Sequence, residues 1–250
     1  MVSPTGEVRR VADAVLRRII DGAYPAGLRL PAEAALAEQL ACGRSTVREA
    51  LRYLAGLGLV RSRRGSGAMV LDFRREGTPA LLPTYLRTGK FDAPPARIAR
   101  EMLRLRALMA TEAVRLAALY ATPETLQQAR THLSDAPALE NDPAAHALNE
   151  LELYRALVMA SGMWPATWMV NAFWAPLGEV NRMFAPAMGP VNPDFQSTMT
   201  RLLDLIAQRD QRGAVQLAGR WFETVDARLV QVIELVLGSK ADQTEPESTD

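Results

Sequence analysis

A cluster of cationic and hydroxyl side chains opens one predicted helix in the first third of the chain. Its members are Arg44, Ser45, Thr46 and Arg48. Residues four apart share a helix face, so the two arginines point the same way. An arginine fork matches the O6 and N7 acceptors of guanine, and a hydroxyl can donate to phosphate or contact a thymine methyl group. The spacing therefore predicts a surface that reads base edges in duplex DNA.

A second basic segment lies at the tip of a predicted hairpin. Residues 59–62 and 68–71 alternate like two short strands around the sequence RRGSG at 63–67. Such a slim tip can enter a minor groove, where arginine meets concentrated negative potential. We expect Arg64, beside Gly65, to make this contact.

The hydrophobic pattern predicts a scaffold for these side chains. Apolar residues recur at helical spacing over 8–21, 32–40 and 44–57. Helix, helix, tight turn, helix and hairpin, in this order, are typical of a winged helix-turn-helix. Gly43 is acceptable as the N-cap of the third helix, although it has no side-chain acceptor.

The charge distribution favours the same interpretation. Residues 1–75 hold thirteen arginines and seven acidic residues, whereas the other 175 residues hold sixteen basic and twenty-one acidic residues. A basic first third is expected if only that part of the chain faces phosphate.

The rest of the chain reads as helix. We expect helices at about 96–121, 123–133, 143–161, 164–184, 193–209 and 211–237. The fold class is therefore mainly α: an N-terminal winged helix-turn-helix followed by an all-α antiparallel helical bundle. The expected divisions are a DNA-binding domain at 1–72, a linker at 73–95, an effector-binding and dimerisation domain at 96–238 and a disordered tail at 239–250.

Composition excludes several classes of protein. Apolar residues make up 48% of the 250 residues and charged residues 23%, which is ordinary for a globular protein. Cys42 is the only cysteine, which suits a reducing cytoplasm, and we expect neither a signal peptide nor a membrane span. No Ser-His-Asp order and no phosphate-binding glycine loop is present, so we do not expect an enzyme.

The segments LPAEAALAEQL, GRSTVREALRYLAGLGLV and RRGSGAMV resemble the winged-helix domain of the GntR superfamily of bacterial repressors. The resemblance covers about residues 8–71 and implies a homodimer on a short palindromic DNA operator. It implies base contacts from Arg44 and Arg48, and supporting contacts from Ser45 and Thr46. It also implies a minor-groove contact from Arg64 with Gly65.

Two positions depart from that family. The family often has arginine where this chain has Ala34, and serine or threonine where it has Gly43. We therefore expect one contact to be missing at Ala34 and the operator preference to be shifted.

The helical remainder, about 96–237, resembles the FadR branch of the superfamily, in which a helical bundle binds an effector. Many members of this branch hold a divalent metal with one Asp and three His, but this chain has Glu150 and Tyr154 where an Asp and a His are expected. Only His132 and His146 are present in the chain. We therefore expect no metal and no cofactor, and we expect both histidines to be ordinary surface or loop residues.

The metal-free members of the branch resemble this chain in binding no metal, and their bundle takes an acyl-coenzyme A. The resemblance thus implies an effector of the acyl-coenzyme A or small carboxylate type, with Arg106 as the pocket cation. Alternatively, Arg106 forms a structural pair with Glu150 or Glu112. Further pocket candidates are Tyr154, Arg155, Asn171, Asn181 and Trp221.

Two alternatives stay open at this point. The Trp-, Met- and Phe-rich segment 164–184 could line a pocket for a ligand or could simply be core. The expected function is a ligand-responsive repressor that a small metabolite releases from DNA. The alternative is an effector-independent DNA-binding protein whose helical domain only dimerises.

Overall fold

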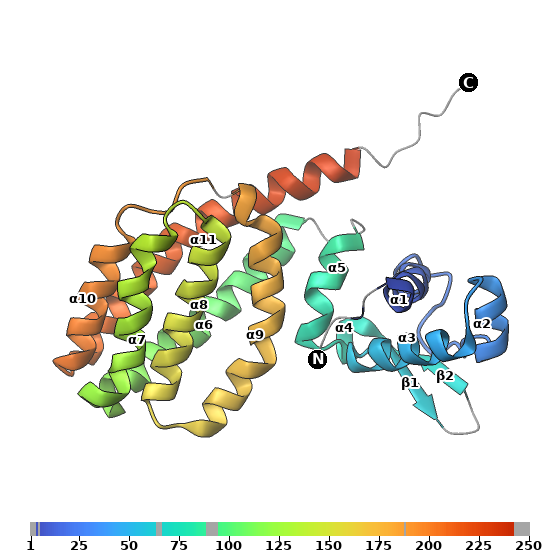
Figure 1. Cartoon of the computed structure of the whole chain (residues 1–250), viewed down its shortest axis with the longest axis horizontal. Coiled ribbons are helices and arrows are strands. Elements are labelled where there is room, and N and C mark those ends of the chain that lie inside the picture. The colour runs from blue at the N-terminus through green and yellow to red at the C-terminus, as the bar shows by residue number, and fades with distance from the viewer. Residues whose placement is uncertain (1–3, 5, 64–66, 89–94, 188, 243–250) are drawn as a thin grey trace. The chain divides into compact units, whose positions relative to one another are not determined.

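In a computed structural model, the protein is described at residues 4, 6–63, 67–88, 95–187 and 189–242. The chain divides into two compact units, Met1–Lys90 and Phe91–Asp250. The elements of the first unit are α1 (Gly6–Ile20), α2 (Glu33–Gln39), α3 (Arg44–Gly56), β1 (Val60–Arg63), β2 (Gly67–Val70), α4 (Phe73–Glu76), η1 (Pro79–Leu81) and α5 (Leu82–Thr88) (Figure 1).

The core of the first unit forms where α1 and α3 pack together. Val11 and Val15 of α1, and Val47 and Leu54 of α3, are buried in it. They recur at intervals of three, four or seven, which places the apolar side chains of each helix on one face. This packing leaves the opposite face of α3 in solvent, where its polar residues lie.

The wing is an antiparallel hairpin with Val60 opposite Val70. A third segment joins it, because Arg29 bridges Met69 and the Leu30 N–H donates to the Ala68 carbonyl at 2.8 Å. The sequence predicted the two strands but not this third partner.

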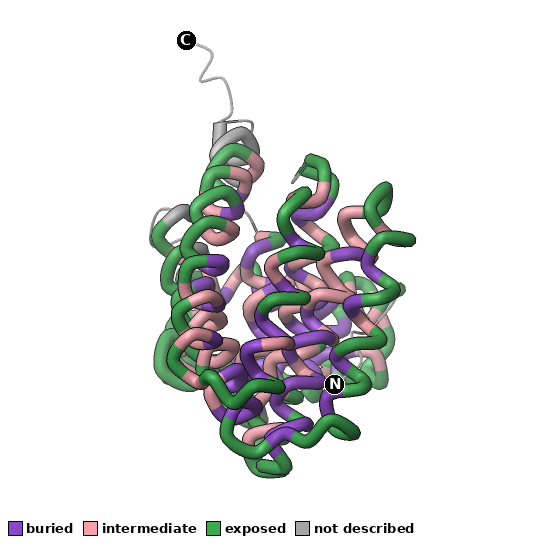
Figure 2. Tube along the Cα trace, turned by 90° about the vertical axis from the view of Figure 1, so that its left-hand side faces the viewer, coloured by how far each residue is buried: buried purple, intermediate pink, exposed green. Residues whose placement is uncertain are grey.

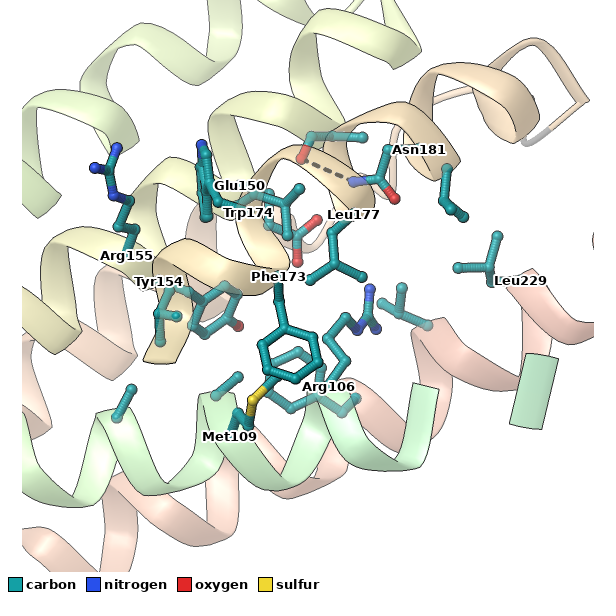
Figure 3. Close-up of a pocket in the computed structure, with 18 of the residues that line it drawn as sticks. Arg106, Met109, Glu150, Tyr154, Arg155, Phe173, Trp174, Leu177, Asn181 and Leu229 are labelled. Atoms are coloured by element: carbon teal, nitrogen blue, oxygen red, sulfur yellow. Dashed lines mark hydrogen bonds between the residues drawn. The ribbon is translucent and has the colours of Figure 1, made fainter. Parts of the chain in front are cut away.

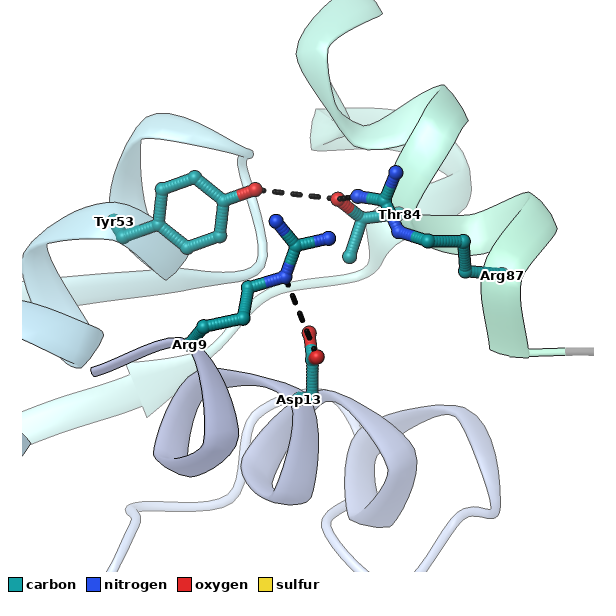
Figure 4. Close-up of polar contacts among 5 residues, drawn as sticks. All are labelled: Arg9, Asp13, Tyr53, Thr84 and Arg87. Carbon is teal, nitrogen blue, oxygen red and sulfur yellow. Dashed lines mark hydrogen bonds and ion pairs between the residues drawn. The ribbon is translucent and has the colours of Figure 1, made fainter. Parts of the chain in front are cut away.

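Residues 73–88 belong to the first unit, which differs from the linker expected at 73–95. Leu81 is buried in the first core. Tyr53 of α3 hydrogen-bonds to Thr84 of α5 at 3.2 Å, and Arg87 donates to the same Thr84 hydroxyl at 2.9 Å (Figure 4). Thr84 is buried, and these bonds satisfy its hydroxyl group. The segment is therefore packed helix, and the units divide after Lys90.

The second unit is helical throughout its described residues. Its elements are α6 (Pro95–Tyr120), α7 (Pro123–Asp135), η2 (Ala136–Leu139), α8 (Pro143–Ala160), α9 (Trp164–Phe184), η3 (Ala185–Ala187), α10 (Phe195–Ala207) and α11 (Gln211–Asp242). Since α11 continues to Asp242, the expectation of disorder from 239 is wrong for its first four residues; the remainder, 243–250, lies outside the described residues.

The start of each helix in this unit follows from its capping residues. Asp142 accepts hydrogen bonds from the backbone N–H groups of Ala144 and Ala145 at the start of α8. Thr122 and Thr125 cap α7 reciprocally, with Pro123 in the first turn.

The helices of this unit bury their apolar sides against one another, and the tube in Figure 2 shows buried and exposed positions alternating along them. The core includes Leu153 and Leu157 of α8, and Met199, Leu202 and Leu203 of α10. Among the described residues, no helix is both long enough and apolar enough to cross a membrane.

Candidate nucleic-acid interface and internal pocket

The start of α3 is open to solvent. Arg44 and Ser45 are exposed and Thr46 is half-buried. Gly43 caps the helix without a side-chain hydrogen bond. The first N–H groups of a helix have no partner within it, and they are therefore available to a phosphate oxygen. The structure thus brings both guanidinium and backbone donors to one exposed helix end.

Arg48 is exposed but already has a partner. Its guanidinium grips the carboxylate of Glu33 on α2, with Nη2 at 2.7 Å from Oε2 and Nε at 3.2 Å from the same oxygen. The hydrogen bond from Arg48 lowers the pKa of the Glu33 carboxyl. Sequence reasoning missed this pair, since the two residues are fifteen apart and belong to different helices. In the unbound chain, Arg48 is therefore held by α2 rather than free to meet a base.

Changing Glu33 to glutamine is expected to tighten binding to non-specific DNA about threefold. The substitution removes a negative charge beside the surface that we expect to face phosphate, and it loosens an exposed ion pair worth less than about 1 kcal/mol. Fluorescence anisotropy with random-sequence duplex DNA at several salt concentrations measures this. Glu38→Gln, an exposed change on the same helix, is the control. Equal affinities for the Glu33 variant and the parent would contradict a role for this charge.

The wing contributes less to the described interface. Arg64 and Gly65, expected in the minor groove, lie outside the described residues. Arg61, on β1, donates to the carboxylate of Glu76 on α4 at 3.2 Å. This exposed pair joins the hairpin to α4, a contact that the sequence pattern did not indicate.

The second unit contains a cavity of about 100 Å³ between α6, α8, α9 and α11 (Figure 3). Most of its wall is hydrocarbon or aromatic; the apolar side chains include Met109, Leu151, Phe173, Trp174, Leu177 and Leu229. The segment 164–184 therefore lines a pocket, and it does so with one side of α9. A cavity with an apolar wall and a few polar groups is the usual form of a small-molecule site.

The polar groups of the pocket gather around Arg106 of α6. Its Nη2 donates to Asp226 of α11, so its partner is neither Glu150 nor Glu112. Glu112 instead pairs with Arg115 at 2.6 Å. The expectation of a structural pair was right in kind and wrong in partner.

Glu150 of α8 lies across the cavity from Arg106 (Figure 3) and accepts a hydrogen bond from Trp221 Nε1 at 3.1 Å. Removal from water raises the pKa of the Glu150 carboxyl, and Arg106 and Trp221 only partly oppose this. Burial likewise raises the pKa of Asp226, and it raises that of Tyr154 well above its usual value. Removal from water thus favours the neutral form of each of these acids.

The other candidate residues have different positions. Arg155 lines the cavity with its stem, whereas its guanidinium points away (Figure 3), lies 5.3 Å from the centre of the Trp174 ring and pairs with Glu152 at 3.4 Å. Asn181 lines the cavity and donates to the Ala147 carbonyl at 3.5 Å.

Two candidates do not line this pocket. Asn171 is exposed on α9, so its expected place in the pocket is wrong; Val170 and Phe173, on the other side of that helix, form the wall. Trp221 is buried and acts only through its bond to Glu150, while its ring lines a neighbouring cavity of about 290 Å³.

The histidines correct another expectation. His146 is buried on α8, with its ring 4.5 Å from that of Phe195, so it is not a surface or loop residue. Burial lowers the pKa of His146. His132 is half-buried and hydrogen-bonds to Asn149 at 3.0 Å. Within the described residues, no three His, Cys, Asp or Glu side chains are grouped as a metal would require.

Changing Glu150 to glutamine is expected to stabilise the protein at about pH 8 and to have little effect near pH 4. An acid whose pKa is raised by folding contributes its full stability below the pKa of the unfolded chain, and that stability is lost as pH rises through the folded pKa. Glutamine keeps an acceptor for Trp221 but cannot ionise. Each unit of raised pKa corresponds to about 1.4 kcal/mol.

Thermal unfolding over this pH range tests that expectation. Glu101→Gln, at an exposed position of α6, is the control and should leave the pH profile unchanged. The same difference between Glu150→Gln and parent at every pH would show that ionisation of Glu150 is not the cause.

Two family models match the chain. Residues 7–70 match the model described as "Bacterial regulatory proteins, gntR family", and residues 101–224 match the FCD domain. These ranges contain the α3 surface and nearly all of the described pocket.

Known proteins are similar over most of the chain. The HTH-type transcriptional regulator Mce2R of Mycobacterium tuberculosis is 31% identical over 229 residues, which covers 89% of this chain and 91% of that protein. The fatty acid metabolism regulator protein of Edwardsiella ictaluri is 30% identical over 148 residues, 59% of each chain. The solved structure of Lar, from work on the Listeria monocytogenes agr system, is 15% identical with a TM-score of 0.58, covers 92% of this chain and 99% of that one, and supports the fold alone.

Proposed function

Because the chain belongs to the GntR family of bacterial regulators, in the branch that carries an FCD domain, we propose that it is a ligand-responsive repressor. That it is a DNA-binding transcriptional regulator and not an enzyme follows from the family. The proposal adds that it binds a palindromic operator as a homodimer and that a small metabolite releases it.

The observation that carries the proposal is the exposed, uncapped start of α3. Arg44 and Ser45 stand in solvent at a helix end whose N–H groups are free of side-chain caps. Phosphate contacts would fix the helix in the major groove, and Arg44 would read a base edge. Arg48 would contribute after exchanging Glu33 for a base, which makes its contact dependent on the DNA sequence.

An exposed apolar face on α9 supports the homodimer. Trp164, Trp168 and Met169 are each more than 60% exposed, and the two tryptophan rings pack edge to face at 4.9 Å. No charged residue occurs from Met163 to Gly178. Large exposed apolar patches typically mark an interface. We assign this face to a second copy of the chain.

Changing Trp168 to glutamate is therefore expected to lower the fraction of dimer at micromolar concentration. The carboxylate would be buried without a partner in the interface, which opposes association. Light scattering after size-exclusion chromatography measures the mass. Leu235→Glu, at an exposed apolar position of α11, is the control. A dimer as stable as the parent's would place the interface elsewhere.

The pocket supports a response to a ligand. It lies within the FCD domain, and its wall combines apolar side chains with the Arg106, Asp226 and Glu150 cluster. A ligand changes DNA affinity only if it binds the two conformations of the regulator unequally. The alternative, an FCD domain that only dimerises, predicts no such response.

Selection from random duplex DNA with the full chain tests the proposal. We expect a palindromic site, bound with one dimer per duplex, and less transcript from a promoter that overlaps this site. A site without symmetry would contradict the dimeric mode, and more transcript would contradict the repressor. No change in operator affinity with any metabolite that binds the pocket would favour the effector-independent alternative.

A further inference from the structure

The charges around the pocket indicate which ligands it can hold. At its polar end, one guanidinium, that of Arg106, faces two carboxyl groups, Asp226 and Glu150. Arg106 lies 5.3 Å from the centre of the Phe222 ring, which keeps it on this wall. Acids therefore outnumber the cation where a ligand head group would lie.

The second cation of the wall does not correct this balance. The Arg155 guanidinium points away from the cavity and pairs with Glu152 (Figure 3). Among the described residues that line the cavity, no guanidinium lacks a carboxylate partner. A ligand carboxylate would become a third acid beside Arg106 in an apolar wall. Burying a charge without its own partner is strongly unfavourable.

One donor at this end nevertheless lacks an acceptor. The Nε of Arg106 is buried and makes no hydrogen bond to the described residues. Glu150 uses one oxygen for Trp221, and its raised pKa favours the protonated form, which can donate. A neutral oxygen atom on a ligand can accept from either group without adding a charge.

The size of the cavity limits the ligand further. Its volume of about 100 Å³ is below that of an apolar cavity of about 150 Å³ known to hold benzene. The pocket therefore suits a compact molecule, with modest opening of the helices, better than it suits the polar and anionic body of a coenzyme A thioester.

We propose that the pocket binds an uncharged, largely apolar molecule whose oxygen atom hydrogen-bonds to Arg106 and Glu150, in preference to a carboxylate or an acyl-coenzyme A. This inference rests on the proposed function, because it names the chemical class of the effector in the same pocket.

Titration of the full chain with a matched series tests the class. The probes are hexan-1-ol, hexanoate, hexylammonium and hexanoyl-coenzyme A at about pH 7.5, followed by calorimetry. We expect hexan-1-ol to bind at least about tenfold more tightly than each charged probe. Equal or tighter binding of hexanoate or the thioester overturns the proposal, as does tightest binding of hexylammonium or a failure of hexan-1-ol to bind.

Two variants tie the preference to named residues. Asp226→Asn releases Arg106, so the ratio of hexanoate affinity to hexan-1-ol affinity should rise about tenfold; an unchanged ratio overturns the role of this pair. This is a gain of binding, which misfolding cannot imitate. Leu177→Trp fills the cavity and should abolish binding of hexan-1-ol, whereas Ala172→Trp, at an exposed position of α9, should preserve it. Binding that survives Leu177→Trp overturns the assignment to this cavity.

Operator affinity, measured in parallel, separates the two proposals. A carboxylate that binds the pocket and releases DNA overturns the inference about charge but supports the ligand-responsive regulator. A preference for the neutral probe, with no effect of any pocket ligand on operator affinity, supports the inference about charge and contradicts the proposed release.

Discussion

Replacing Arg44 by alanine is expected to weaken operator binding by about 1–3 kcal/mol at each half-site, or roughly 10- to 100-fold. Arg44 is exposed at the first residue of α3, where no side chain caps the helix. Only the first turns of a recognition helix reach base edges, and a bidentate arginine–guanine pair distinguishes one base from the others. A homodimer loses this contact twice on a palindrome.

Binding to the selected operator and to random duplex DNA separates base reading from phosphate contact. Loss of a base contact weakens operator binding more than non-specific binding and relaxes the preference at one base pair. Loss of a phosphate contact weakens both alike and reduces the salt dependence by about one ion. Arg17→Ala, on the exposed side of α1, is the control and should change operator affinity by less than about threefold.

An operator affinity unchanged by Arg44→Ala would place the reading surface elsewhere on the unit. If Arg48→Ala then caused the larger loss, the pair with Glu33 would be the means by which α2 orients the reading arginine. The two single variants and the double variant Glu33→Gln/Arg48→Ala distinguish these cases, since the effect of Glu33→Gln should vanish once Arg48 is absent.

The helical scaffold of the first unit was predictable because its cues are local. Apolar spacing placed α1, α2 and α3, and Gly43 marked the start of α3. What the sequence concealed was which polar residues of different elements meet. Arg48 with Glu33, and Tyr53 with Thr84, join segments fifteen and thirty-one residues apart. No periodicity encodes such pairs, so residues 73–88 read as a linker although they are packed helix.

The pocket shows the same limit at longer range. Arg106 could be proposed from its resemblance to a pocket arginine, but its partner Asp226 is 120 residues away. A signal was present, since Asp226 follows Phe222 and Val225, which line the pocket at helical spacing on α11. A lone acid on an otherwise apolar helix face indicates a buried partner. Asn171 failed for the opposite reason: its position on α9 turns it to solvent.

Replacing Arg106 by methionine is expected to destabilise the protein by about 3 kcal/mol at neutral pH, because breaking a buried pair leaves a charge uncompensated. The side chains of Arg106 and Asp226 are only 15% and 17% exposed. Two carboxyls would remain in the wall with no cation. Arg106 lowers the pKa of both, and without it both values rise further. Chemical denaturation at a series of pH values measures the loss.

The loss from Arg106→Met should shrink as pH falls toward about 4. A carboxyl whose pKa is raised by folding contributes fully below the unfolded pKa and loses that contribution as pH rises through the folded one, so protonated Asp226 and Glu150 tolerate an absent cation. Arg106→Met/Asp226→Leu should recover most of the stability, since well-packed apolar residues can replace a buried pair. Arg115→Met, which breaks the exposed pair with Glu112 on the same helix, should cost less than about 1 kcal/mol. If the two single arginine variants were equally stable at neutral pH, the acids around the pocket would be solvated rather than buried, and the argument for an uncharged ligand would lose its physical basis.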